Sequence, residues 1–311
     1  METNKKLKIA MLYASWENFG EKWSTPIGIK NEFLSRGHEV HQYNLYHNDG
    51  ELPPNRMRKY SNQGINQLHQ DFNSKRCVPD IIFCLDYGPW DALQFDKQFF
   101  PGVMLISEAG DEPQSHRQHL AKAFRVHYVL SPDRQCVQRY NDMGCKAIWW
   151  THHADTRLFY PNSNVPEIFD CVTTCGPRGG GLTEIIKEAF GERFNNERYF
   201  YGADHAKRLN MGKIVFQKSQ FNEITRRVFE GMLCGKMVIT DRLPPETGLQ
   251  DLFIDGLDIV YYDNAQDAID KIRYYASHDS ERLAIAENGY KKVLENHTCS
   301  QRVDDILGVC S

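Results

Sequence analysis

Short, uniformly apolar runs recur along this chain and constrain its fold more than any other feature of the sequence. In the first half they lie at residues 8–14, 80–85, 103–107, 126–130 and 147–150, and a further, half-polar strand candidate lies at 40–45. Segments with helical spacing stand between most of them, at residues 26–36, 113–124 and 134–143. Strands that are apolar throughout are typical of a parallel sheet covered by helices on both faces. The first half therefore predicts a doubly wound α/β domain.

A second series of the same kind follows a cluster of chain breakers at residues 151–166. Strands are predicted at residues 169–174, 198–201, 214–217, 237–240 and 259–262, and helices at 183–190, 223–233, 266–278 and 280–307. We therefore expect a domain over residues 1–155, a second over 156–290, and a C-terminal helix over 291–311 that could pack back on the first domain. Because such sheets bind ligands at the carboxyl ends of their strands, a cleft between the two domains is the predicted binding site.

Composition and charge exclude several classes of protein. The 311 residues suffice for two domains, and the formal net charge of −4 gives no bulk attraction to nucleic acid or to an anionic membrane. The first eight residues are polar and lack the apolar core of a signal peptide, and no apolar run is long enough to cross a bilayer. The nine cysteines include no C-x-x-C pair, so reduced thiols are expected. These features predict a cytoplasmic protein that does not insert into membranes.

Residues 213–241 form the most informative segment, because their pattern predicts a strand, a loop, a helix, a glycine turn and a second strand. Asn222 can cap the helix, and Glu230 falls near its middle. The Glu230 carboxylate could accept hydrogen bonds from a ribose diol, while Arg226 or Arg227 and the amides of the helix N-terminus face phosphates. An amphipathic surface helix with ordinary charges remains an open alternative.

The same segment resembles the donor-binding region of group 1 glycosyltransferases, and particularly their CgeB-like (spore maturation protein) branch. The residues that carry the resemblance are Lys213, Asn222, Arg227, Phe229–Glu230, Cys234–Gly235 and Thr240–Asp241, and the likeness covers about the C-terminal third of the chain. It implies an α/β protein of the GT-B type, with two Rossmann-like doubly wound domains and an interdomain cleft. It also implies a hexosyl- or pentosyltransferase that uses a nucleotide-sugar, with UDP-sugar as the expected donor and no separate cofactor.

The sequence departs from the group 1 pattern at one position. Many members carry two glutamates separated by seven residues, of which the first typically meets the sugar and the second the ribose. Here Glu230 matches the second, but Asn222 occupies the first position. The resemblance thus implies ribose binding by Glu230, whereas Asn222 can hydrogen-bond a sugar hydroxyl only as a neutral group. Neither the identity of the sugar nor the stereochemical outcome follows from the sequence.

A glycine-rich stretch at residues 175–181 (CGPRGGG) follows a predicted strand and precedes a predicted helix. Gly176 and Gly179 would let the backbone approach a phosphate, and Arg178 could add a charged contact. The stretch is neither G-x-G-x-x-G nor a P-loop, so a plain turn remains an alternative. No Asp-x-Asp occurs in the chain, which predicts a metal-independent enzyme. Lys213 and Arg178 are predicted to stabilise the leaving diphosphate.

Residues 107–116 (SEAGDEPQSH) follow the fourth predicted strand of the first domain, where an acceptor-side group would lie. Asp111 or Glu112 could act as the general base or stabilise positive charge on the sugar, and Asp111 is the match to an acidic residue common there in related proteins. A helix cap beside Pro113 is the alternative. His116 and His119 are spaced for one helix face but lack a third ligand, so no metal site is predicted.

The acceptor is left open by the sequence. Trp16 and Gly20, in the loop after the first strand, and His153, between the domains, are predicted acceptor contacts, although core packing or a surface position would also explain them. A small molecule or glycan is the expected acceptor. The first alternative is a hydroxymethylated pyrimidine in DNA, suggested by basic and aromatic residues such as those at 56–60. The second is a nucleotide-binding protein of the same fold without turnover.

Overall fold

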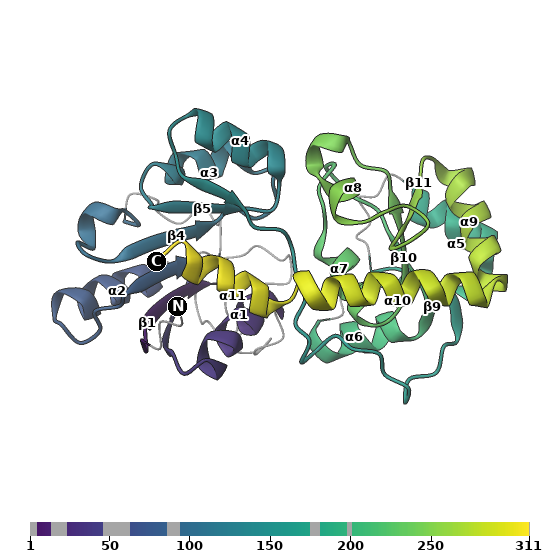
Figure 1. Cartoon of the computed structure of the whole chain (residues 1–311), viewed down its shortest axis with the longest axis horizontal. Helices are drawn as coiled ribbons and strands as arrows, with labels where there is room; N and C mark the ends of the chain where they lie inside the picture. The colour runs from purple at the N-terminus through teal and green to yellow at the C-terminus, as the bar shows by residue number, and fades with distance from the viewer. Residues whose placement is uncertain are drawn as a thin grey trace. The chain divides into compact units, whose positions relative to one another are not determined.

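The structure, a computed structural model, describes residues 5–13, 24–45, 63–85, 94–174, 181–197 and 201–310. The chain divides into two compact units, residues 1–151 together with 302–311, and residues 152–301. The sequence placed the first boundary after residue 155 and the start of the final segment at 291. Each unit contains one parallel sheet flanked by helices (Figure 1).

The sheet of the first unit has six strands in the order β2-β1-β3-β4-β5-β6, and all neighbouring pairs are parallel. The strands are β1 (Lys8–Tyr13), β2 (Glu39–Asn44), β3 (Ile81–Cys84), β4 (Met104–Glu108), β5 (Tyr128–Ser131) and β6 (Ala147–Trp149). The helices are α1 (Ser24–Ser35), α2 (Gln63–Asn73), η1 (Lys97–Phe99), α3 (His116–Ala123) and α4 (Arg134–Asp142). Every residue of β3 is buried, as expected for a strand covered on both faces.

The last ten residues of the chain return to the first unit. They include most of α11 (Cys299–Gly308). The indole N–H of Trp150 donates to the Arg302 carbonyl at 3.2 Å, and the Arg36 guanidinium lies 2.5 Å from the Asp304 carboxylate. Trp150 is among the largest fully buried side chains, so this hydrogen bond satisfies the polar N–H of a buried ring.

The sheet of the second unit has five strands in the order β11-β10-β9-β7-β8, again all parallel. The strands are β7 (Phe169–Val172), β8 (Phe194–Asn195), β9 (Gly212–Gln217), β10 (Met237–Asp241) and β11 (Val260–Tyr262). The helices are α5 (Leu182–Phe190), η2 (Gly191–Arg193), α6 (Gly202–Asn210), α7 (Arg226–Leu233), η3 (Pro245–Thr247), α8 (Leu249–Leu252), α9 (Ala265–Ser277) and α10 (Asp279–Asn296). The two Rossmann-like units together give the α/β fold of the GT-B type that the sequence predicts.

Two parts of the second series of elements differ from the sequence prediction. The edge strand is β8, at residues 194–195, whereas the predicted strand at 198–201 falls mostly outside the described residues and Tyr201 is the N-cap of α6. The helix predicted over 280–307 is two helices. They separate at Thr298, whose hydroxyl accepts the Ser300 amide at 3.2 Å and so starts α11.

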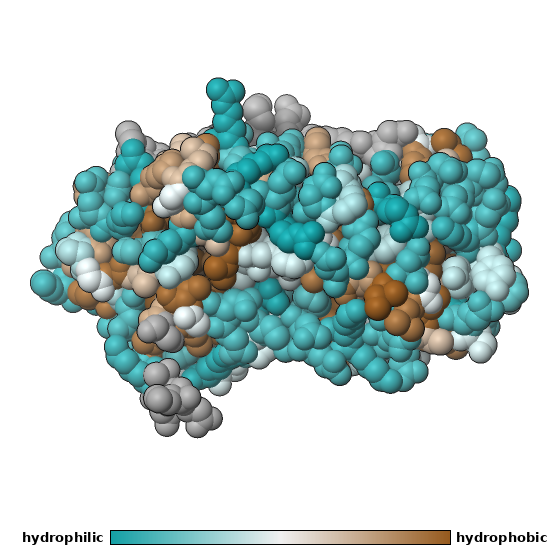
Figure 2. Space-filling view, turned by 45° about the horizontal axis from the view of Figure 1, so that its top comes forward, coloured by the Kyte–Doolittle hydropathy of each residue, from teal (hydrophilic) through white to brown (hydrophobic). Residues whose placement is uncertain are grey.

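In the described part of the chain, no helix combines the length and apolar character needed to cross a bilayer. On the face shown in Figure 2, hydrophobic residues form small separate patches among hydrophilic ones. This surface is ordinary for a folded protein, because single exposed apolar side chains are common on such surfaces.

Candidate functional site

The topology of the second sheet locates the candidate site. From β7 the chain passes to β8 on one side and then to β9 on the other, so the strand order reverses between β7 and β9. In open parallel sheets, ligands bind outside the carboxyl ends of the strands at this switch point. The residues that follow β7 and β9, beginning at Thr173 and Lys218, therefore border the site.

Helix α7 brings Glu230 close to this edge of the sheet. A Cβ on Gly231 would lie 3.0 Å from a methyl of Val238 and 3.1 Å from a methyl of Val215, so the glycine lets the helix pack directly on β9 and β10. Glu230 itself is only 5 % exposed. A carboxylate with so little contact with water needs polar partners, from the protein or from a ligand.

The helix begins at Arg226 with Thr225 as its N-cap, so the predicted cap at Asn222 is wrong. Asn222 lies three residues before Thr225, is exposed, and has a φ of 54°, in the left-handed region that asparagine tolerates better than most residues. Asn222 therefore belongs to a turn that precedes the helix, and it is not the N-cap. Its side chain is exposed to solvent and able to meet a ligand.

His205, on α6, links Glu230 to the end of β7. Its Nδ1 lies 3.9 Å from Glu230 Oε2, and its Nε2 lies 3.2 Å from the Thr174 hydroxyl. The Phe159 ring packs edge-on against the imidazole at 5.7 Å. Burial lowers the pKa of His205, the Arg227 charge lowers it further, and Glu230 opposes both. The imidazole is therefore neutral at pH 7, and Glu230 and Arg227 are both close enough to act on it.

Arg227 is held at the end of β9 by Gln217. Its Nε donates to Gln217 Oε1 at 2.8 Å, while Nε2 of the same Gln217 side chain donates to the Lys218 carbonyl at 2.8 Å. The Tyr262 hydroxyl donates to the Gln217 carbonyl at 3.1 Å, which fixes the strand end. Among the described residues, Arg227 forms no ion pair, so the other N–H groups of its planar fork remain for an anion.

The loop between β9 and α7 is fixed by Asp241, at the end of β10. The Ser219 amide donates to Asp241 Oδ1 at 2.9 Å, and the Glu223 amide donates to the Ser219 hydroxyl at 2.7 Å. Burial raises the pKa of Asp241, and the hydrogen bonds it accepts and the nearby Lys218 oppose that effect. The Thr240–Asp241 pair that the sequence singled out thus organises the loop that leads into α7.

Lys213 lies at the opposite edge of the sheet, because it is the second residue of β9. Its ammonium donates to the Ala276 carbonyl at 3.2 Å, in the last turn of α9, and its own carbonyl accepts from Arg282 at 3.4 Å. A cation at a helix C-terminus stabilises the helix. This position favours a structural role for Lys213 and does not support contact with a donor at the carboxyl ends of the strands.

Other predicted contacts are placed as follows. Arg226 is half-buried in the first turn of α7. His153 is 2 % exposed, at the start of the second unit. The remaining predicted contacts lie outside the described residues: Trp16, Gly20, Gly176, Arg178 and Gly179.

In the first unit, the loop after β4 gives the two candidate carboxylates different environments. Asp111 is exposed and has a φ of 52°. Glu112 is buried and accepts hydrogen bonds from Ser131, from Tyr140 and, at 2.9 Å, from His116 Nδ1. Burial raises the pKa of Glu112, and these bonds oppose the shift. Glu112 is thus fully used within the unit, whereas Asp111 is exposed at the surface of the loop.

The helix that follows this loop, α3, begins at His116 with Ser115 as its N-cap, so neither acidic residue caps it. Among the described residues, one group of potential metal ligands lies within 4.8 Å, formed by Glu112, His116 and Cys136. Because Glu112 already accepts three hydrogen bonds and burial raises the pKa of Cys136, this group is explained as a hydrogen-bonded core.

His119 contacts the same loop, and its burial should make folding stability depend on pH. Its Nε2 lies 2.8 Å from the Gly110 carbonyl, and burial, together with Lys122, lowers the pKa of His119 to about 3. As pH falls below about 6.5, the His119 imidazole takes up a proton in the unfolded chain but not in the folded chain. Folding stability therefore falls as pH drops from about 6.5 toward 3. His119→Gln keeps an N–H donor without titrating. Between pH 7 and 5, urea unfolding should show wild type losing roughly 2 kcal/mol more than the variant; parallel losses would contradict this origin.

The second unit, in which the candidate site lies, is similar in sequence to a known protein family. The model of a family described as glycosyl transferase-like matches residues 175–308, which is less than half of the chain but includes α7 and the loops after β7 and β9. A sequence search of the curated proteins found no match.

The fold of the whole chain is similar to that of solved structures. A sucrose-phosphate synthase from Thermosynechococcus elongatus is 12 % identical, with a TM-score of 0.73 and 98 % of each chain covered. The Anabaena protein HepE, in complex with UDP and glucose, is 13 % identical, with a TM-score of 0.67 over 97 % of this chain and 99 % of that one. A Listeria monocytogenes structure assigned to a UDP-N-acetylglucosamine 2-epimerase is 12 % identical, with a TM-score of 0.57 over 97 % and 95 %.

Likeness at these identities shows the fold, and one fold can host different reactions. The chain has the GT-B fold of the glycosyltransferases, and its residues 175–308 match a glycosyl transferase-like family.

Proposed function

We propose that this protein transfers a sugar from a nucleotide-sugar, with a UDP-sugar as donor, to an acceptor hydroxyl. The observation that carries the proposal is the meeting of Glu230, His205, Thr174 and Arg227 at the switch point of the second sheet. These residues lie within the family match, apart from Thr174, which immediately precedes it. The UDP and glucose bound to HepE support the choice of donor.

Each group has a defined task in this proposal. Glu230 accepts hydrogen bonds from the ribose hydroxyls. His205, which is neutral and hydrogen-bonded to Thr174, limits the positions that the Glu230 carboxylate can take. Arg227 and the first amides of α7 face the diphosphate, as helix N-termini commonly do with phosphates. Arg178, Gly176 and Gly179 are proposed to complete the phosphate site, and Asn222 and Arg226 to approach the sugar and phosphates.

In the transfer step, the bond between the anomeric carbon and the phosphate oxygen breaks, and the acceptor oxygen bonds to that carbon. UDP leaves with the bonding electrons, and the hydroxyl proton passes to a base. Asp111 is the proposed base or charge stabiliser, since Glu112 is occupied within the first unit. Trp16, Gly20 and His153 remain proposed acceptor contacts.

The finer assignments are also proposals. They include the CgeB-like branch, hexosyl or pentosyl transfer, a small molecule or glycan as acceptor, and a cytoplasmic location. The DNA-acceptor alternative depended on basic and aromatic residues at 56–60, 75–76 and 117–139, of which the first segment lies outside the described residues. None of the relatives named above acts on DNA by its description.

The proposal is tested by incubating the protein with UDP-glucose and following the products by NMR. Transferase chemistry predicts slow release of UDP and free glucose, because water can replace a missing acceptor. The rate should be the same in EDTA and in Mg²⁺, since Arg227 and the helix amides supply the positive field. UDP binding without release would favour the non-catalytic alternative. An epimerised sugar would indicate a different reaction on the same fold. Loss of release in EDTA, restored by Mg²⁺, would contradict metal independence.

A further inference from the structure

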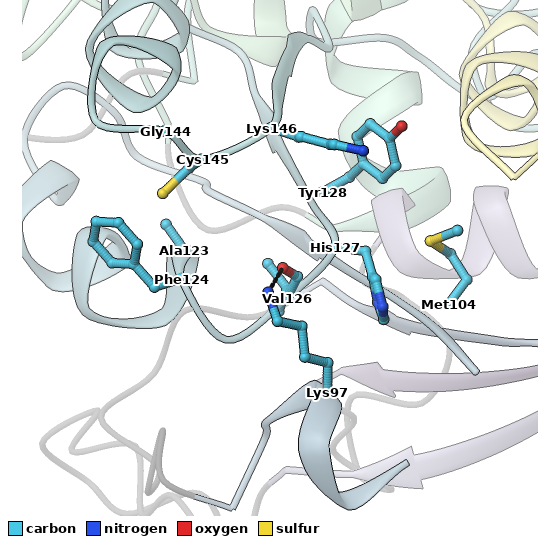
Figure 3. Close-up of a pocket in the computed structure, with 10 residues that line it drawn as sticks. All are labelled: Lys97, Met104, Ala123, Phe124, Val126, His127, Tyr128, Gly144, Cys145 and Lys146. Carbon is cyan, nitrogen blue, oxygen red and sulfur yellow. Dashed lines mark hydrogen bonds between the residues drawn. The ribbon is translucent and has the colours of Figure 1, made fainter. Parts of the chain in front are cut away.

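A cavity of about 360 Å³ opens in the first unit, at the amino ends of β4, β5 and β6 (Figure 3). Met104 begins β4, Tyr128 begins β5, and Lys146 directly precedes β6. Ligands of this fold class bind at the carboxyl ends of the strands. This cavity lies at the other edge of the sheet, so neither the acceptor nor the donor of the proposed reaction explains it.

Two lysine side chains approach the cavity from different elements. Figure 3 shows Lys97 directed toward Val126 and Lys146 directed toward Tyr128. Lys97 Nζ lies 3.5 Å from the Val126 carbonyl, and Lys146 Nζ lies 5.4 Å from the centre of the Tyr128 ring. Among the described residues, neither lysine forms an ion pair, and none of the residues lining the cavity is Asp or Glu. The cavity lining therefore carries two ammonium groups and no carboxylate.

His127 adds a hydrogen-bond donor. Its Nδ1 accepts the Leu105 amide at 3.0 Å, so in the neutral ring the proton is on Nε2. Burial and the charges of Lys97 and Lys146 lower the pKa of His127. Two ammonium groups and one imidazole N–H thus belong to residues that line the same cavity.

The rest of the lining is apolar. Met104, Ala123, Val126 and Cys145 contribute to the walls, and Phe124 is 52 % exposed. A bare inorganic anion would satisfy the charges but leave these surfaces in water. A ligand with an apolar group would cover them and gain roughly 25 cal/mol for each Å² removed from water.

From this combination we propose that the cavity binds a small organic anion, with a phosphate or carboxylate group between the lysines and an aromatic or short aliphatic group against Phe124. The site is separate from the nucleotide site, and the inference does not depend on the proposed function. Any ligand of this cavity should combine one anionic group with one compact apolar group.

Phenyl phosphate is the probe, compared by calorimetry at low salt with inorganic phosphate and with phenol. Phenyl phosphate should bind saturably and more tightly than phosphate, and phenol should not bind. Lys97→Ala/Lys146→Ala should weaken phenyl phosphate about tenfold, as expected for losing two partly exposed charge contacts. The matched double variant Lys6→Ala/Lys75→Ala removes the same charge from exposed positions of the same unit and should bind as wild type.

Phe124→Ala provides a second test that leaves the charges in place. It should weaken phenyl phosphate severalfold and leave inorganic phosphate unchanged, because it removes only apolar contact. Equal melting temperatures would show that the variants are folded. The proposal is overturned by absent saturation, by equal losses in both lysine pairs, or by displacement of phenyl phosphate with UDP, which would assign binding to the nucleotide site. Saturable binding that UDP leaves unchanged, and that depends on Lys97 and Lys146, supports it.

Discussion

Glu230→Ala is expected to weaken UDP binding by roughly 10- to 150-fold, which corresponds to losing about 1.5–3 kcal/mol for a charged hydrogen bond. Glu230 is 5 % exposed, and its carboxylate lies 3.9 Å from His205, so the side chain can adopt few conformations. A preorganised acceptor gains more from a ribose diol than a mobile surface carboxylate would. Calorimetric titration with UDP measures the effect.

A comparison with 2′,3′-dideoxy-UDP isolates the ribose contact. Wild type should prefer UDP over the dideoxy analogue by a factor close to the loss in Glu230→Ala, and the variant should bind both alike, since the interaction is then missing from either side. Glu188→Ala, at an exposed position of α5 in the same unit, should bind as wild type. If Glu230→Ala kept a full preference for UDP, the ribose role would be excluded.

The parallel sheets could be predicted from the sequence because each buried strand needs an uninterrupted apolar run. Residues 81–84 and 237–240 are buried throughout, and runs this short and uniformly apolar fit a strand covered on both faces better than a helix with one solvated side. The edge strand β8 could not be predicted, because two residues carry no periodic signal and an edge is paired on one side only. The break at Thr298 was missed because His297 packs against Phe229 and Phe253, and only the tertiary fold shows that contact.

The site could be predicted only in part. Glu230 and Arg227 were found because they lie on one helix, with fixed spacing and a family resemblance. His205 and Gln217 were missed because they come from a helix that was not predicted and from a strand end, and only the fold brings them to α7. Lys213 was chosen for its charge and position in a motif, but its place in the first residues of β9 puts it at the amino edge of the sheet.

Replacing Arg227 by Ala should therefore lower kcat for UDP release by on the order of 10²-fold, while the KM for UDP-glucose rises less. Negative charge grows on the leaving phosphate oxygen as the glycosidic bond breaks, so a cation there binds the transition state better than the ground state. Gln217 holds the guanidinium through Nε, which leaves the terminal N–H groups for the diphosphate. Arg227→Lys should recover only part of the rate, because an ammonium does not reproduce a planar fork that is held by Gln217.

Lys213→Ala is the matched control, because it removes a cation from the amino end of β9, whereas Arg227 is held at the carboxyl end of the same strand. Its ammonium meets the Ala276 carbonyl at the end of α9, so the variant should keep both kinetic constants within about twofold and lose only a few tenths of a kcal/mol to about 1 kcal/mol of stability. The reverse result, with Lys213→Ala inactive and Arg227→Ala unaffected, would place the donor diphosphate at the amino edge of the sheet. Such a result would contradict the switch-point site, and equal losses in both variants without loss of folding would do the same.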